Sequence, residues 1–131
     1  MKKYIVLKLI GLAMLAMISL VVISIIEVAF YSYAVNPGQE AKVYETHANF
    51  SAPFISGIFG FIIFFFIARH WKKEYHNSFT LTLLFPLIYV LLDMLVLLSM
   101  NTVQWSGFIL IYTLANGAKF LGSYLGYKLT N

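Results

Sequence analysis

Two residues of opposite charge lie inside long apolar runs, and these are the residues most able to do chemistry. Asp93 lies in the run 79–100, and Lys119 lies in the run 105–125. A charge within the hydrocarbon of a bilayer costs about 3 kcal/mol or more unless it is paired, hydrated or neutralised. We therefore expect Asp93 and Lys119 to face each other across two neighbouring antiparallel helices.

Polar neighbours at helical spacing extend this pair. Spacings of three or four residues place side chains on one face of a helix, so Tyr89 falls beside Asp93. The predicted polar seam consists of Asp93, Lys119, Asn116, Tyr112, Tyr89 and Ser123. Such a seam could relay protons or ions, or it could bind a polar ligand. It could equally contain a structural ion pair that fixes the register of the two helices.

Glu27 is a further candidate for a proton or ligand site, near the outer end of the first apolar run. Ser24 and Tyr31 share its helical face. A glutamate shielded from water can take up and release a proton near neutral pH. If the helix leaves the hydrocarbon near Ile26, Glu27 lies among the lipid headgroups instead.

The sequence assigns no catalytic residue, no metal site and no cofactor. The chain has no cysteine, and the spacing of its three histidines matches no common metal site. Glu45 and His47, together with Glu27, could form an acid–base group at the outer face. No nucleophile or oxyanion hole is recognisable beside them, so the sequence favours a protein that is not an enzyme.

Composition predicts a membrane protein. Of 131 residues, 61% are hydrophobic and 11% charged, and so small a globule could not hide that much apolar surface from water. Lipid requires every backbone group to be paired within its own segment or barrel, and runs of this length are helices. We predict a single all-α domain over 1–131, an antiparallel four-helix transmembrane bundle. The expected helices are about 9–35, 50–69, 79–100 and 105–127, with an outer loop 36–49, a turn at 101–104 and a kink at Pro86.

The cations predict the orientation of the chain. Lys42 falls at the outer end of the bundle, whereas seven cations fall at the other end: Lys2, Lys3, Lys8, Arg69, Lys72, Lys73 and Lys128. Because positive residues are retained on the cytoplasmic side, both termini are predicted to be cytoplasmic, in a bacterial inner membrane. These cations do not form a stripe suited to nucleic acid. Tyr31, Tyr33, Tyr44 and Trp105 would mark the outer interface, and Tyr4, Trp71, Tyr75 and Tyr127 the inner one.

Small residues at every fourth position predict two surfaces where helices approach closely. One is formed by Ala52, Ser56 and Gly60, and the other by Ala118, Gly122 and Gly126. Such stripes allow backbones to touch in lipid, and we expect a contact within the chain. The phenylalanines of the second run are expected to face lipid or a partner: Phe59, Phe61 and Phe64–Phe66.

Three functional hypotheses follow. The first is a non-enzymatic subunit, assembly factor or regulator of a membrane complex, with a membrane-protein partner or a second copy of the chain. The alternative is a homo-oligomeric transporter or channel that uses the Asp93 and Lys119 seam, and a weaker alternative is a membrane enzyme at the outer face. In size and helix count the chain resembles the small multidrug transporters, which use a glutamate in their first helix, although Glu27 lies far later in its helix.

Overall fold

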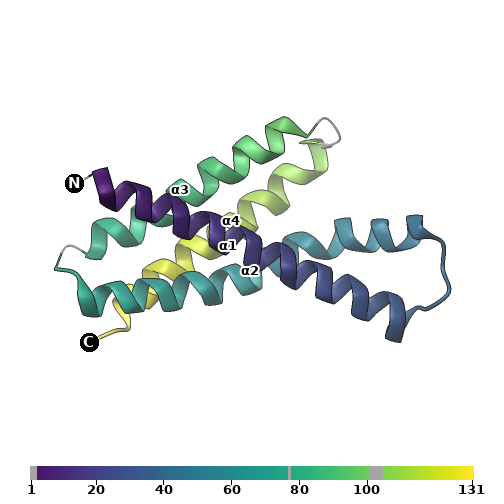
Figure 1. Ribbon diagram of the computed structural model, residues 1–131, viewed down its shortest axis with the longest axis horizontal. Coiled ribbons are helices and arrows are strands. Elements are labelled where there is room, and N and C mark those ends of the chain that lie inside the picture. The colour runs from purple at the N-terminus through teal and green to yellow at the C-terminus, as the bar shows by residue number, and fades with distance from the viewer. Residues whose placement is uncertain (1–2, 77, 101–104) are drawn as a thin grey trace.

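The described residues form an all-helical fold without strands, as predicted. The computed structural model describes residues 3–76, 78–100 and 105–131. Its elements are α1 (Lys3–Phe30), a π-helical segment η1 (Tyr31–Val35) that continues α1, α2 (Ala41–Glu74), α3 (Ser78–Ser99) and α4 (Trp105–Lys128). The start of α1, the end of α4 and the adjoining ends of α2 and α3 lie at the same end of the molecule (Figure 1).

Three segments of the described chain are long and apolar enough to cross a membrane: Lys3–Val35, Ala41–Glu74 and Ser78–Ser99. Helix α4 is not among them. It has 24 residues, which is long enough, but polar residues such as Asn116 and Lys119 lower its mean hydropathy. The fourth crossing and the cytoplasmic side of both termini stay predictions.

The helix bounds differ most from the prediction at the outer hairpin. The expected loop 36–49 is corrected to 36–40, because α2 already begins at Ala41. The apolar run marks only the part of a helix that suits hydrocarbon, and helix-favouring residues such as Lys42 and Glu45 extend it. Helix α2 has 34 residues, or about 51 Å, against about 30 Å of hydrocarbon. The predicted turn 101–104 and the side chain of Trp105 lie outside the described residues.

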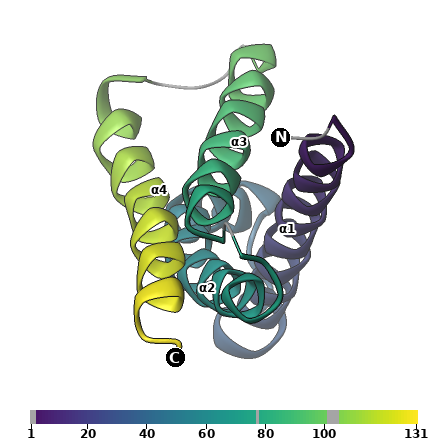
Figure 2. The same cartoon turned by 90° about the vertical axis from the view of Figure 1, so that its left-hand side faces the viewer.

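The core lies between α1, α2 and α3. Helix α1 contributes one stripe of buried residues: Leu9, Ala13, Ala16 and Leu20. This stripe packs against Phe64 and Trp71 of α2 and against Leu81, Phe85 and Tyr89 of α3. Figure 2 shows α2 and α3 between α1 and α4, so α4 lies on the far side of these two helices and outside this core.

Aromatic rings join α2 to α3. The ring centroids of Phe64 and Phe85 are 4.6 Å apart, those of Trp71 and Phe85 5.2 Å, and those of Phe64 and Tyr89 5.3 Å. Phe64 is fully buried, which corrects the expectation that all phenylalanines of this helix face outward. One face of α2 must meet α3, and Phe64 lies on it.

Helices α2 and α4 make the closest contact in the molecule. A Cβ atom added at Gly57 would lie 3.5 Å from the Cα atom of Ala115. One added at Gly122 would collide with the carbonyl oxygen of Phe61, and one at Gly126 with that of Phe65. The backbones therefore touch within one chain, and only glycine fits at Gly122 and Gly126.

This contact predicts that Gly122→Ala destabilises the fold by about 1–3 kcal/mol, because the added methyl group forces α2 and α4 apart. Thermal unfolding in mild detergent, followed by circular dichroism, measures the change. Gly117→Ala is the matched control, because nothing lies within 4 Å of a Cβ atom there. That control should be neutral or slightly stabilising, since alanine favours the helix; an unaffected Gly122→Ala protein would contradict the contact.

Candidate functional site

The ammonium group of Lys119 is enclosed by three helices. Its side chain is fully buried, with 0% exposed. Nζ donates to Ser56 Oγ of α2 at 2.7 Å and to Asn116 Oδ1 at 3.3 Å, and it lies 4.8 Å from the ring centroid of Tyr89 on α3. Neutral dipoles and a ring face thus replace the hydration of this cation.

Asp93 does not form the predicted direct ion pair with Lys119. The two ion pairs among the described side chains lie elsewhere, between Glu27 and His47 and between His70 and Glu74. Asp93 is half-buried on α3 and interacts with Lys119 only at longer range. Because α4 packs most closely on α2, the ammonium group of Lys119 bonds to Ser56 of α2 rather than to Asp93 of α3.

The remaining residues of the polar seam fall into two places. One part lies on α4 beside Asp93 and consists of Tyr112 and Asn116. The hydroxyl oxygen of Tyr112 is buried there. Ser123 lies apart and donates its hydroxyl hydrogen to the carbonyl oxygen of Thr82 at 2.7 Å. Thr82 is four residues before Pro86, and a proline within a helix leaves that carbonyl without its usual amide partner. Ser123 therefore satisfies a buried acceptor that Pro86 creates.

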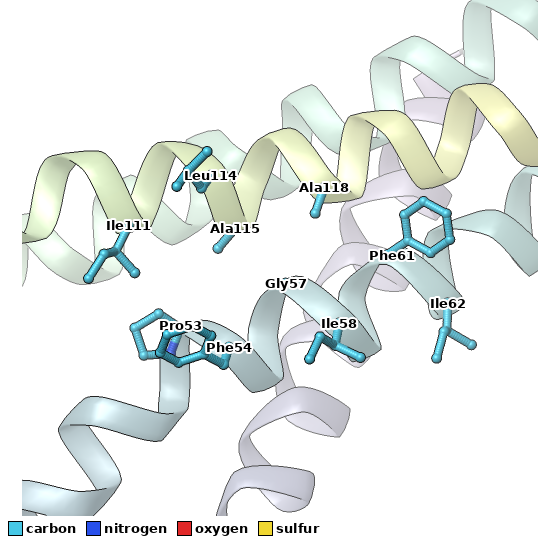
Figure 3. Close-up of a pocket in the computed structure, with 10 residues that line it drawn as sticks. All are labelled: Pro53, Phe54, Gly57, Ile58, Phe61, Ile62, Ile111, Leu114, Ala115 and Ala118. Atoms are coloured by element: carbon cyan, nitrogen blue, oxygen red, sulfur yellow. The ribbon is translucent and has the colours of Figure 1, made fainter.

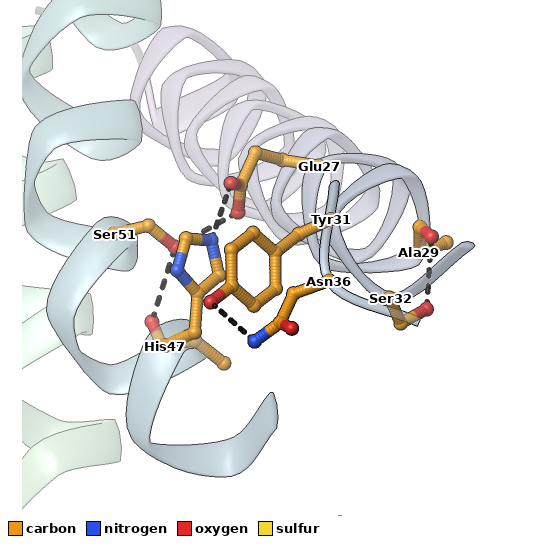
Figure 4. Close-up of polar contacts among 8 residues, drawn as sticks. Glu27, Ala29, Tyr31, Ser32, Asn36, His47 and Ser51 are labelled. Atoms are coloured by element: carbon orange, nitrogen blue, oxygen red, sulfur yellow. Dashed lines mark hydrogen bonds and ion pairs between the residues drawn. The ribbon is translucent and has the colours of Figure 1, made fainter. Parts of the chain in front are cut away.

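A second polar group lies between α1 and α2 near the hairpin that joins them. We call Glu27, Tyr31, His47 and Ser51 the outer cluster, after the predicted side of the membrane (Figure 4). His47 Nε2 lies 2.6 Å from Glu27 Oε1, and Ser51 Oγ donates to Glu27 Oε2 at 2.9 Å. The rings of Tyr31 and His47 are stacked, with centroids 3.6 Å apart and planes 3° from parallel. Both oxygens of the carboxylate are thus engaged by α2.

The hairpin connection is tied to the same cluster. Asn36 Nδ2 donates to the hydroxyl oxygen of Tyr31 at 3.2 Å. The Tyr44 hydroxyl group donates to the carbonyl oxygen of Asn36 and accepts from the backbone N–H of Gln39, both at 2.9 Å. Gly38 turns the chain with a φ of 76°, a backbone conformation that glycine adopts without strain.

The outer cluster lacks the geometry of a nucleophile and its base. In that geometry a hydroxyl group bonds to the imidazole, and a carboxylate orients the imidazole from its other side. Here both Ser51 and His47 bond to the same carboxylate, and Glu45 is exposed away from these contacts. Within the described parts of the chain, no three histidine, cysteine or acidic residues gather to hold a metal ion. The cluster fastens α1 to α2.

An apolar groove lies where α2 and α4 diverge, and we call it the α2/α4 groove (Figure 3). Its volume is about 620 Å³. Gly57, Ala115 and Ala118 form its floor, and exposed side chains such as Phe54, Ile58 and Leu114 form its walls. Pro53, Phe61, Ile62 and Ile111 complete the lining. Neither Lys119 nor Asp93 lines it.

Comparison of the chain with protein-family models, with curated proteins and with solved structures gives no match. The function must therefore be argued from the geometry of these three places. Two of them use their polar groups to join helices of the same chain. The third leaves a concave apolar surface uncovered.

The Ser123 and Thr82 contact predicts a dependence on Pro86. Ser123→Ala should destabilise the protein by about 1–3 kcal/mol, because the buried carbonyl group of Thr82 loses its donor. In a Pro86→Ala background the helix supplies an amide donor to that carbonyl, so Ser123→Ala should cost far less. A double-mutant cycle from thermal unfolding measures the difference, and equal costs in both backgrounds would show that Ser123 has another role.

The outer cluster predicts energetic coupling between Glu27 and His47. Glu27→Gln and His47→Ala should each destabilise the hairpin, and the double variant should lose less than the sum by about 1 kcal/mol. Limited proteolysis of the α1–α2 connection, together with thermal unfolding, measures each variant. Additive effects would mean that the close contact contributes nothing to stability. Thr46→Ala is a neighbouring control, because its hydroxyl group bonds only within α2, to Lys42 O.

Proposed function

We propose that this chain is a non-enzymatic component of a membrane-protein complex, and that the α2/α4 groove receives a transmembrane helix of another protein. The observation that carries the proposal is the groove itself: it is apolar, it is open at its side, and its floor is made of Gly57, Ala115 and Ala118. Small residues allow two backbones to approach where no hydrophobic force drives association.

The shape of the groove suits a helix better than a compact ligand. Its two walls come from different helices, with Phe54 and Ile58 on α2 and Leu114 on α4 (Figure 3). A helix laid between them contacts both walls, with its side chains between theirs, as in other helix-in-groove contacts. Polar anchors, which orient most small ligands, do not line this surface.

The contacts of Lys119 and Glu27 support association rather than transport or catalysis. Lys119 is enclosed and engaged by Ser56 and Asn116, and Glu27 is engaged by His47 and Ser51. A transport path needs such groups to exchange with water or solute, and both are committed to contacts between helices. A subunit, an assembly factor and a regulator all act through contact, so the proposal covers these roles. We also propose that the cationic end of the chain lies on the inner side of a bacterial cytoplasmic membrane.

Filling the groove tests the proposal. Ala118→Leu places a larger side chain on its floor, and we expect co-purification of the partner to fall by about tenfold or more after gentle extraction from the native membrane. Gly117→Leu is the control, because Gly117 is exposed on α4 with open space around it. That variant should keep the partner. Circular dichroism checks that both variants fold.

Photo-crosslinking identifies what occupies the groove. A photoreactive residue in place of Ile58 should attach to an apolar helix of another protein, whereas one in place of the exposed Leu95 on α3 should not. Crosslinks to a second copy of this chain would replace the proposal by a homo-oligomer. A lone monomer under every mild condition, or a partner retained equally by Ala118→Leu, would refute it.

A further inference from the structure

A second pocket lies at the cationic end of the molecule, between the first turns of α1, the last turns of α2 and the start of α3. Its volume is about 210 Å³, and we call it the interfacial pocket. Its residues are Tyr4, Ile5, Lys8, Leu9, Trp71, Tyr75 and Leu81. The lining therefore combines one cation with aromatic rings and aliphatic side chains.

Lys8 is the charged residue of this pocket, and its ammonium group is only partly engaged. Nζ donates to the hydroxyl oxygen of Tyr75 at 3.1 Å and lies 5.7 Å from the centroid of that ring. An ammonium group has three donors, so others are left for an anion. The nearby carboxylate of Glu74 forms an ion pair with His70, at 3.3 Å, and not with Lys8.

The surroundings strengthen the positive potential at this end. Arg69, Lys72 and Lys73 lie in the last turns of α2, and Lys3 begins α1. Lys72 faces the ring of Tyr127, 4.6 Å from its centroid, and Lys73 is exposed. An anion that approaches Lys8 therefore meets a field of several cations.

The pocket is also apolar at its base. Leu9, Trp71 and Leu81 are buried members of the helix core, and their outer surfaces form the apolar wall at the base of the pocket. A soluble phosphate ion would gain nothing from that wall. A lipid would, because its headgroup carries the charge and its acyl chain covers the aliphatic surface. Tyrosine and tryptophan are also the residues that favour the headgroup level of a bilayer.

We infer that the interfacial pocket binds an anionic phospholipid, with the headgroup phosphate on Lys8 and the upper part of an acyl chain against Leu9, Trp71 and Leu81. This site is separate from the α2/α4 groove and does not depend on a protein partner. Its occupant comes from the membrane in which the helices lie. Association with anionic lipid would fasten the start of α1 to the turn between α2 and α3.

Quenching of Trp71 fluorescence tests the site directly. The chain has two tryptophans, so a Trp105→Phe background leaves Trp71 as the reporter in the pocket wall. The protein is reconstituted in phosphatidylcholine vesicles that contain increasing amounts of phosphatidylglycerol with brominated acyl chains, and separately brominated phosphatidylcholine. We expect phosphatidylglycerol to quench at a several-fold lower mole fraction than phosphatidylcholine does.

Variants separate a defined site from diffuse surface charge. Lys8→Gln should reduce the preference for phosphatidylglycerol by about tenfold, because the headgroup phosphate loses a direct charge-assisted hydrogen bond as well as a nearby charge. Lys8→Arg should keep most of it. Lys73→Gln removes an equal charge at the same end but outside the pocket, and should change the preference by less than twofold.

Three results would overturn the inference. They are equal quenching by the two lipids, an unchanged preference in Lys8→Gln, and an equal loss in Lys8→Gln and Lys73→Gln. The last result would assign the preference to surface charge alone. Tyr75→Phe gives a further check: it removes the hydroxyl group that accepts from Lys8, so the preference should be kept or increased, and its loss would also contradict the inference. Circular dichroism confirms that each variant keeps its helices.

Discussion

The contact between the backbones of α2 and α4 is the constraint on which the other features depend. Gly122 and Gly126 lie against the carbonyl groups of Phe61 and Phe65, and Gly57 lies against Ala115. In lipid, where apolar side chains gain little from leaving their solvent, such close packing is a main source of helix association. The contact brings Ser56 within reach of Lys119, and where the helices diverge beyond it, it leaves the α2/α4 groove.

Lys119, Ser123 and Glu27 each take part in contacts that satisfy polar groups where lipid cannot hydrate them. Lys119 is held by two neutral acceptors and a ring face, and Ser123 covers the carbonyl group that Pro86 leaves without an amide partner. At the outer hairpin, both oxygens of Glu27 are engaged by α2. These contacts specify which helices meet. What remains for recognition is the apolar groove and the cationic end.

Hydropathy and charge were sufficient to predict an all-helical chain with apolar spanning segments, because each run carries that signal locally. Partners between helices could not be predicted so well. Lys119 was expected to pair with Asp93, whereas Ser56 lies closer because α4 packs on α2. His47 was placed in a loop, and only when residues 41–49 are helical do His47 and Ser51 share the face toward Glu27. The relation of Ser123 to Thr82 was detectable in principle, since Pro86 frees the carbonyl four residues earlier.

Oxygen accessibility of a spin label in the groove tests the central claim most directly. The chain has no cysteine, so Ile58→Cys and Leu95→Cys each give one labelled site, in the groove and on the exposed face of α3. In the purified chain in lipid, both labels should be readily accessible to oxygen. In the native membrane assembly, accessibility at position 58 should fall while that at position 95 stays high. Full accessibility at both positions in the assembly would contradict a groove occupied by a partner helix.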